Sequence, residues 1–393
     1  MGSAVPDDVT NVAVADDRPY VRAGTVITTC ACREDRYSIH IVPDDAAVLD
    51  ALAREIGDRV AAIVTDENVE VLHARRLASG LTERGIDVRI TAIAPGEQSK
   101  NLRTACQLLE WLAAADFGRL DVLLAVGGGV VIDTAGWVAS AYMRGIPYVN
   151  VPTTLLAQVD AAIGGKVAVN HARAKNLIGA FYQPRAVVSG IHYLGTLSER
   201  EIRAGLAEVI KKAVIASPDV FAFLEQELDS ILAAEPAAAL PLVHAASSIK
   251  TRLVERDPYE ADLRRTLNFG HTVGHALETA TGYGPLLHGE AVAFGMAVAV
   301  RIATHRGLID ADSRARILGL IAAADLPLTY EDLGVPVLPG DVLAAIDAIR
   351  QVRAGHLRFV LPTGIGSTLI TDDVTNGEIR AALFAPTRVA SAV

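Results

Sequence analysis

The chain has 393 residues, of which 51% are hydrophobic and 21% charged, and its formal net charge is −10. This length and composition suffice for two domains with sizeable cores, which excludes a disordered chain. The acidic balance excludes an unspecific nucleic-acid binder, although it allows a local basic pocket. Three cysteines cannot build a disulfide framework, which favours a reducing, cytoplasmic compartment.

The first residues predict no export signal. The stretch "MGSAVPDDVTNVAVADDRP" is acidic and lacks a basic region before an apolar core, so we expect a loose segment over residues 1–20. "CAC" at Cys30–Cys32 has no matching second pair, which favours a structural role over a metal site. The apolar run "AVAFGMAVAV" is too short for a membrane span and lies between Glu290 and Arg301, so a buried helix is predicted.

Residues 21–190 alternate short apolar runs with helical patterns. Strands are predicted in 60–65, 121–126 and 145–152, and helices in 99–117 and 130–143. Strand, helix, strand, helix is the order of an α/β domain with a parallel sheet. Ligands of such sheets bind beyond the carboxyl ends of the strands, where "TDENV", "GGGVVID" and "VPTT" follow.

The loop "AVGGGVVID" follows a strand and opens a helix. Glycines allow a ligand to approach the backbone, and the free N–H groups of a helix N-terminus suit a pyrophosphate. A tight turn without a ligand is the alternative, because the sequence is not G-x-G-x-x-G. Asp66 and Asn68 in "TDENV" follow an earlier strand, where an acidic side chain can accept hydrogen bonds from ribose hydroxyls.

The stretch "VPTTLLAQVDAAIGGKVAVNHARAKNLIGAFYQP" places lysines and asparagines among glycines and small residues. Together with the nearby Arg144, the lysines Lys166 and Lys175 can form an anion pocket in an otherwise acidic chain. A solvated loop with surface charges is the alternative.

Residues 191–393 are predicted to form a mostly α-helical domain. Helical patterns cover 198–215, 236–257, 272–282, 289–307 and 311–325. In "NFGHTVGHA", His271 and His275 are four residues apart, and His288 follows in "PLLHGEAVA". Two histidines at this spacing share a helix face, and three ligands of the type His₂Glu would make a catalytic zinc site with Glu208 as the carboxylate. The spacing leaves open whether His271 binds an ion with His275 or with His288, and packed or phosphate-binding rings remain possible.

These motifs together resemble the sugar phosphate cyclases, most closely the 3-dehydroquinate synthases. The resemblance runs from "TDENV" through "PGEQSK", "GGGVVID", "KNLIGAFYQP", "GLAEVIK", "RRTLNFGHTVGHALE" and "LLHGEAVAFGM" to "LRFVLP". It implies a Rossmann-like α/β domain followed by an α-helical domain that binds metal and substrate, and a homodimer. It also implies NAD and Zn²⁺ as cofactors, with Co²⁺ as the alternative ion.

The resemblance also assigns the site residue by residue. The zinc ligands of the family match Glu208, His271 and His288. The phosphate pocket matches Arg144, Lys166, Asn176 and His275. Residues that handle ring hydroxyls beside the metal match Asp160, Lys211 and Asn268, and the pair that binds the substrate carboxylate matches Lys250 and Arg264. The NAD site matches Asp66, Asn68, Glu97, Lys100, Gly128, Gly129, Asp133, Thr153, Thr154 and Lys175.

The implied reaction acts on a phosphorylated C7 sugar. A ring hydroxyl is oxidised transiently, phosphate is eliminated, the ketone is reduced again, and an intramolecular aldol step closes the carbocycle, so NAD is regenerated. The preferred substrate is 3-deoxy-arabino-heptulosonate 7-phosphate, which would give 3-dehydroquinate in the shikimate pathway. Lys250 and Arg264 favour this acid, as do Asn268 and His275, which we expect to be replaced in the valiolone-forming relatives.

Three other activities are compatible with the sequence. "GIPYV" and "DPYE" resemble cyclases of specialised metabolism that use sedoheptulose 7-phosphate, such as a 2-epi-valiolone synthase, and an aminodehydroquinate synthase is a further possibility. Arg350 stands where the dehydroquinate synthases carry a lysine that reaches the phosphate. From another class, a metal-dependent NAD alcohol dehydrogenase of the glycerol type shares the two-domain plan but would accumulate NADH.

Overall fold

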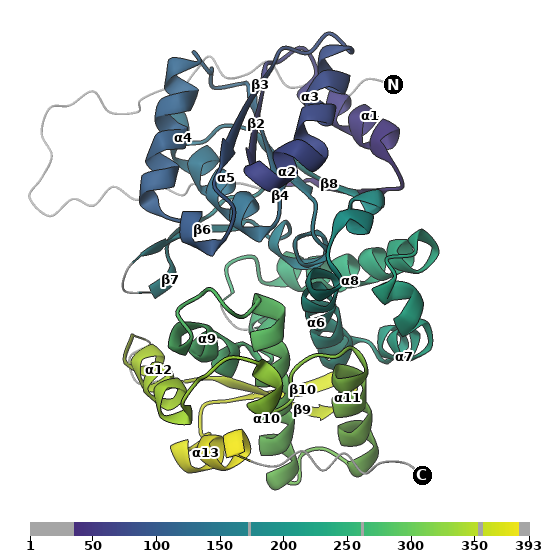
Figure 1. Cartoon of the computed structure of the whole chain (residues 1–393), viewed down its shortest axis with the longest axis vertical. Helices are drawn as coiled ribbons and strands as arrows, with labels where there is room; N and C mark the ends of the chain where they lie inside the picture. Colours follow the sequence, from purple (N-terminus) through teal and green to yellow (C-terminus); the bar gives the residue numbers. More distant parts are fainter. Residues whose placement is uncertain (1–34, 172–173, 261–262, 353–356, 385–393) are drawn as a thin grey trace, which may run out of the picture. The chain divides into compact units, whose positions relative to one another are not determined.

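Six parallel strands form the sheet of the N-terminal half, in the order β1-β8-β5-β4-β2-β3 (Figure 1). The strands are β1 (Ser38–Val42), β2 (Ala61–Asp66), β3 (Val88–Ile93), β4 (Val122–Gly127), β5 (Tyr148–Pro152) and β8 (Ala186–Gly190). Every residue of β4, β5 and β8 is buried. Strands with both faces covered read as continuous apolar runs, and the predicted parallel α/β sheet is therefore confirmed.

The computed structural model describes residues 35–171, 174–260, 263–352 and 357–384. The expected loose segment 1–20 and the Cys30–Cys32 pair lie outside this part. The described residues from Tyr37 onward pack as one compact unit, and the division at residue 190 stays a prediction. Among the described helices, none combines the length and apolarity that a membrane crossing needs.

Helices cover both faces of the sheet. They are α1 (Asp45–Ile56), the short α2 (Glu67–Val69), α3 (Arg75–Thr82), α4 (Leu102–Ala114) and α5 (Gly129–Ala141). Successive strand residues point to opposite faces, so Ile63 packs with α1 and α3 while Val64 packs with α4 and α5. Two N-caps set the helix starts, because Asp44 accepts from Ala47 N and Asn101 from Thr104 N.

An antiparallel hairpin, which the sequence patterns did not predict, follows β5. It consists of β6 (Lys166–His171) and β7 (Ala174–Phe181). Val167 packs against α5 at Gly136, where a Cβ atom would lie 2.4 Å from Val167 Cγ1. Lys166 on β6 and Lys175 on β7 therefore lie on paired strands rather than on a solvated loop.

The C-terminal half is mostly helical, as predicted, with one additional hairpin. Its elements are α6 (Glu199–Ala216), α7 (Pro218–Leu232), α8 (Pro236–Arg256), α9 (His271–Ala280), α10 (His288–His305), α11 (Ala311–Ala323), α12 (Pro339–Val352), β9 (Phe359–Gly364), β10 (Ser367–Thr371) and α13 (Asn376–Phe384). Helix α10 is almost wholly buried. It touches its neighbours at two glycines, where a Cβ on Gly289 would lie 1.8 Å from Ala204 O of α6 and one on Gly295 1.9 Å from Gly270 O before α9. This close packing brings the first turns of α9 and α10 together beside α6 (Figure 1).

Candidate active site

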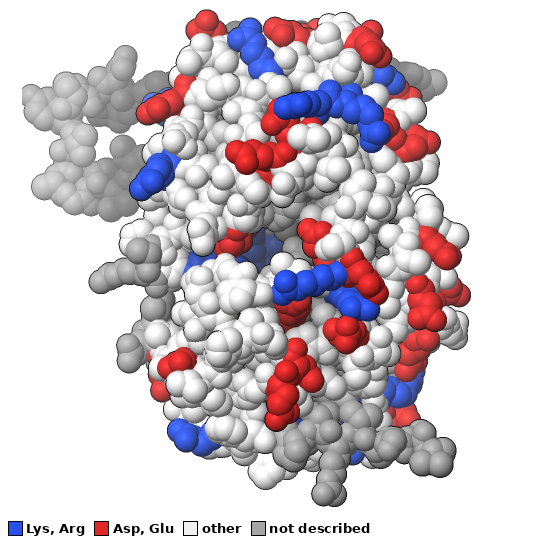
Figure 2. Space-filling model, viewed as in Figure 1, with Lys and Arg blue, Asp and Glu red and all other residues white. Residues whose placement is uncertain are grey.

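A cavity of about 400 Å³ lies at the carboxyl ends of the strands and opens beside the first turns of α9 and α10. Figure 2 shows it as a hollow with basic side chains inside. The predicted site residues that line it are Glu97, Lys100, Gly129, Asp133, Thr154, Asp160, Lys166, Lys175, Asn176, Lys211, Lys250, Arg264, Asn268, His271, His275 and His288. Residues from both halves of the chain therefore line one cavity.

A metal ion fits between Glu208 and two imidazoles. The carboxylate of Glu208 is fully buried on α6, and its Oε1 atom has no hydrogen-bond partner among the described residues. This oxygen lies 3.6 Å from His271 Nε2 and 3.6 Å from His288 Nε2. Ligand atoms of a tetrahedral zinc ion, each about 2.1 Å from the metal, are about 3.4 Å apart. The three side chains thus have the chemistry and the spacing of a His₂Glu set.

Hydrogen bonds orient both rings for this purpose. His271 Nδ1 donates to Phe269 O at 3.2 Å, and His288 Nδ1 donates to Glu278 Oε1 at 3.2 Å, so each Nε2 faces Glu208. Burial lowers the pKa of His271 well below its usual value, which keeps that ring neutral. Burial also lowers the pKa of His288, but Glu278 and Glu208 raise it to about 9. An incoming metal ion would therefore replace the Nε2 proton of His288.

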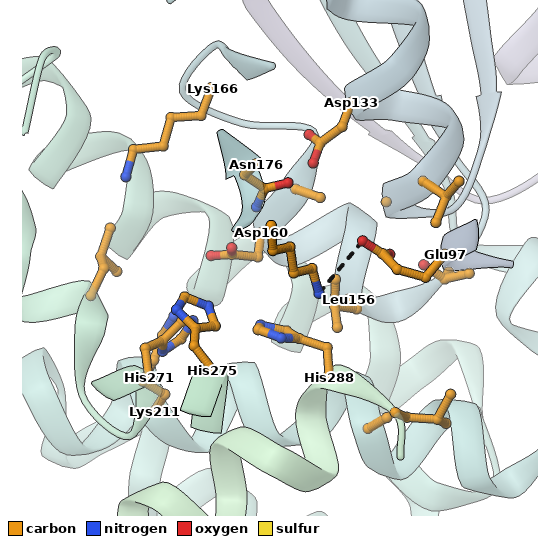
Figure 3. Close-up of a pocket in the computed structure, with 18 of the residues that line it drawn as sticks. Glu97, Asp133, Leu156, Asp160, Lys166, Asn176, Lys211, His271, His275 and His288 are labelled. Atoms are coloured by element: carbon orange, nitrogen blue, oxygen red, sulfur yellow. Dashed lines mark ion pairs between the residues drawn. The ribbon is translucent and has the colours of Figure 1, made fainter. Parts of the chain in front are cut away.

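His275 lies in the same group of rings. Its centroid is 5.1 Å from that of His271 and 5.8 Å from that of His288, and the three labelled imidazoles point into one space in Figure 3. One nitrogen from each ring lies within 4.8 Å of the others, so a three-histidine site is the geometric alternative. The buried oxygen of Glu208 favours His271 with His288, as the family assignment predicts.

A group of lysines surrounds two carboxylates, the buried Glu208 and the half-buried Asp160. Lys211 forms an ion pair with Glu208, while Lys212 and Lys250 lie 2.9 Å and 3.0 Å from Asp160 Oδ1. Burial by itself raises the pKa of Asp160. The charges of Lys212 and Lys250 outweigh this effect and bring the pKa well below its usual value. Burial lowers the pKa of Lys250 to about 8 against the opposing effect of Asp160. The cavity floor therefore carries excess positive charge and suits an anionic ligand.

Three predicted substrate residues, Lys166, Asn268 and Arg264, already have hydrogen-bond or ion-pair partners within the protein. Lys166 forms an ion pair with Glu260, and Asn268 Nδ2 donates to Glu260 Oε1 at 2.8 Å. The guanidinium of Arg264 is 1% exposed and donates to Pro258 O at 2.8 Å and to Gly164 O at 3.1 Å. These bonds fix the side chains before any ligand binds.

The sheet edge of the cavity fits a dinucleotide. Helix α5 begins directly after β4, and Gly128 at its N-cap supplies no side chain to the free N–H groups. A Cβ on Gly128 would lie 3.2 Å from Thr154 Cγ2, so a side chain at this position would crowd the loop after β5. Lys100 donates to both Asp133 and Asn176, which ties α5 to the β6–β7 hairpin. This glycine-rich helix N-terminus can receive a pyrophosphate.

Seven predicted residues do not line the cavity. Glu208 is fully buried on α6 and is not among the lining residues. Thr153 and Gly128 are part of the strand-to-helix turns, and Asp66 caps α2 by accepting from Asn68 N and Val69 N. Arg144 is exposed after α5, and Arg350 lies on α12, where it is 3.5 Å from Asp347. The roles of Arg144 and Arg350 in phosphate binding stay predictions.

Three acidic or basic groups were missed by the sequence patterns. Lys212 holds Asp160, Glu260 holds Lys166 and Asn268, and Glu278 holds His288 and Lys175. A sequence signal existed for Glu278, since His271, His275 and Glu278 follow the i, i+4, i+7 spacing of one helix face. Lys212 had a similar signal, because it stands at i+4 from Glu208 on α6, where its Nζ atom lies 3.8 Å from Glu208 Oε2. No comparable spacing marks Glu260.

Comparisons with known proteins find relatives along most of the chain. The family models described as 3-dehydroquinate synthase N-terminal and C-terminal match residues 90–204 and 205–348. The 2-epi-valiolone synthase of Actinosynnema mirum is 57% identical over 351 residues, covering 89% of this chain and 92% of the relative. The 3-dehydroquinate synthase of Desulforamulus reducens is 42% identical over 352 residues, covering 88% and 96%.

A solved structure has the same fold. It is ValA, a 2-epi-5-epi-valiolone synthase from Streptomyces hygroscopicus subsp. jinggangensis 5008 with NAD⁺ and Zn²⁺ bound. The TM-score is 0.84 at 31% identity, and the match covers 91% of this chain and 98% of that one.

Proposed function

Because the chain belongs to the 3-dehydroquinate synthase family of sugar phosphate cyclases, we propose that it converts sedoheptulose 7-phosphate into a 2-epi-valiolone-type cyclitol and releases phosphate. The observation that carries this choice of substrate is the 57% identity to a 2-epi-valiolone synthase, against 42% to a 3-dehydroquinate synthase over a stretch of the same length. The sequence motifs favour 3-deoxy-arabino-heptulosonate 7-phosphate over sedoheptulose 7-phosphate, and this proposal reverses that order.

We propose NAD and a divalent ion, zinc or cobalt, as the cofactors. NAD supplies reversible hydride transfer, and the ion supplies Lewis acidity to the oxidised oxygen. Glu208, His271 and His288 would hold the ion, and the N-terminus of α5 would hold the dinucleotide. Lys211, Lys250 and Arg264 supply positive charge around the sugar. The homodimer and the cytoplasmic location stay predictions from the resemblance.

The retained cations do not require an acid substrate. Lys250 already donates to Asp160 O at 2.7 Å and lies beside the Asp160 carboxylate, which balances its charge. Arg264 donates to two backbone carbonyls. Because each side chain has partners within the protein, a sugar without a carboxylate leaves neither of them wholly without hydrogen bonds, although Arg264 Nε has no partner among the described residues. The presence of these two residues is thus compatible with sedoheptulose 7-phosphate.

The second candidate is 3-deoxy-arabino-heptulosonate 7-phosphate. Lys250 and Arg264 both line the cavity, and both keep donor groups beyond the bonds described above. A carboxylate could form charge-assisted bonds to this pair. Asn268 and His275 also line the cavity, where the acid reading expects them.

Phosphate release from the two sugars separates these candidates. The purified protein, loaded with NAD and zinc, is given each sugar phosphate in turn while inorganic phosphate is measured. We expect kcat/KM for sedoheptulose 7-phosphate to exceed that for the acid by at least 100-fold, and the cyclitol product to be identified by mass spectrometry. Turnover of the acid alone would exclude the proposed substrate and establish the second candidate.

The pH dependence of binding gives an independent prediction. Lys250, whose pKa burial lowers to about 8, is positively charged below that pH and loses its charge above it. A carboxylate would therefore bind more weakly as the pH rises from 7 to 9, whereas the affinity for a neutral polyol end would not follow this group. We expect the inhibition constant of a C7 acid to rise about tenfold over this range.

The matched control is the Lys250→Met variant, which should bind the acid weakly at every pH. An inhibition constant that rises equally in the variant and in the wild type would assign the pH effect to another group.

A further inference from the structure

Glu278 is a buried acid that joins the metal pocket to the β6–β7 hairpin. It lies on α9 and is 4% exposed. Its Oε1 atom accepts from His288 Nδ1 at 3.2 Å and from Lys175 Nζ at 2.8 Å. Two nitrogen donors thus converge on one buried oxygen, which is the arrangement of a hydrogen-bond acceptor that both elements share.

The bond to His288 determines how that ring can act as a ligand. An imidazole that donates its Nδ1 proton to a carboxylate presents Nε2 as the metal-binding nitrogen, and the carboxylate increases the basicity of the ring. His288 Nε2 lies 3.6 Å from Glu208 Oε1, on the side where the ion would bind. His271 has only a neutral backbone carbonyl, Phe269 O, at the equivalent position. The Nδ1 atoms of the two histidines therefore bond to different acceptors, a carboxylate for His288 and a carbonyl oxygen for His271.

The second partner of Glu278 comes from the other half of the chain. Lys175 lies on β7 and is also 3.6 Å from Glu97, which precedes α4, as the dashed line in Figure 3 marks. The shared oxygen thus holds a histidine of the helical half and a lysine of the hairpin. The position of the Glu278 carboxylate therefore depends on both α10, through His288, and β7, through Lys175.

We propose that Glu278 is a positioning residue that holds His288 in the Nδ1-protonated form and orients it toward the metal ion. The inference rests on the proposed metal site and deepens it by adding a residue that does not touch the ion. Loss of an outer carboxylate of this kind lowers metal affinity about 10- to 100-fold in comparable sites. Glu278→Gln keeps the size of the side chain and removes its charge, so metal affinity should fall by this factor.

The test measures Zn²⁺ affinity by competition with a chelator, and the absorption spectrum of the Co²⁺-loaded protein, with no substrate present. Glu278→Gln should bind Zn²⁺ about 10- to 100-fold more weakly and change the Co²⁺ spectrum. The matched control is Glu290→Gln, on the same helix as His288. Glu290 accepts from Leu287 N and pairs with Arg200, so its variant should keep the wild-type affinity and spectrum.

Wild-type affinity and spectrum in Glu278→Gln would overturn the inference. If Glu278→Gln and Glu290→Gln lose Zn²⁺ affinity equally, the cause is a general disturbance of helix α10. The inference is then also wrong. Should Glu278→Gln not fold, Glu278→Asp keeps the charge but shortens the reach, and it should show a smaller loss in the same direction. His271→Ala tests the metal site itself, because retention of the ion by that variant would refute the site and not only the role of Glu278.

Discussion

His271→Ala is expected to lose its bound zinc and at least about 10³-fold in turnover. The ring supplies one of three ligands, with its Nε2 atom 3.6 Å from Glu208 Oε1. Lewis-acid stabilisation by a metal contributes several kcal/mol, and each 1.36 kcal/mol corresponds to a factor of ten in rate. Zinc content is measured by elemental analysis after dialysis, and turnover by phosphate release.

His275→Ala is the matched control, since it removes the same side chain one turn later on the same helix. It should keep its zinc and lose turnover, because His275 is assigned to the phosphate side of the cavity. Equal zinc loss in both variants would replace the Glu208, His271 and His288 set with a three-histidine site, which the 4.8 Å grouping of the rings also allows.

Gly129→Val is expected to weaken NAD binding at least about 100-fold. Gly129 is the first residue of α5 and lines the cavity. A Cβ there would meet Ala161 Cβ at 3.5 Å, an ordinary contact, so the protein itself accommodates the first added carbon. The valine methyl groups would occupy the space in which a pyrophosphate approaches the helix N-terminus. Isothermal titration calorimetry with NAD measures the effect.

Gly319→Val provides the control for this substitution. Gly319 lies within α11, and a Cβ there meets no atom within 4 Å. Its variant should bind NAD with wild-type affinity and differ only slightly in thermal stability. Unchanged NAD affinity in Gly129→Val would show that the dinucleotide does not bind at the glycine turn.

The local patterns of the sequence predicted the elements that carry most of the site. The apolar run of β4 followed by glycines predicted a strand and a helix N-terminus, and the spacing of His271 and His275 predicted one helix face. Both signals are short-range, so a single sequence contains them. The resemblance then grouped residues that no local pattern could bring together, and sixteen of them line one cavity.

Contacts between distant segments were not predictable in this way. Lys175 and Glu278 are 103 residues apart in the sequence and meet only because the tertiary fold brings a residue of β7 to one of α9. The hairpin was missed because its polar residues, glycines and asparagines are typical of loops, while its stability comes from Val167 packing on α5. Partners such as Asp160 for Lys250 were likewise hidden, and these partners change how the retained cations relate to substrate choice.

The central claim is that the cavity carries out a redox-neutral elimination and ring closure. It is tested most directly by following phosphate and NADH together in one reaction with sedoheptulose 7-phosphate, NAD and zinc. The account predicts many equivalents of phosphate per enzyme while the absorbance of NADH does not increase beyond the amount of enzyme present. NADH that accumulates in step with substrate consumed, without release of phosphate, would identify an alcohol dehydrogenase and contradict the account.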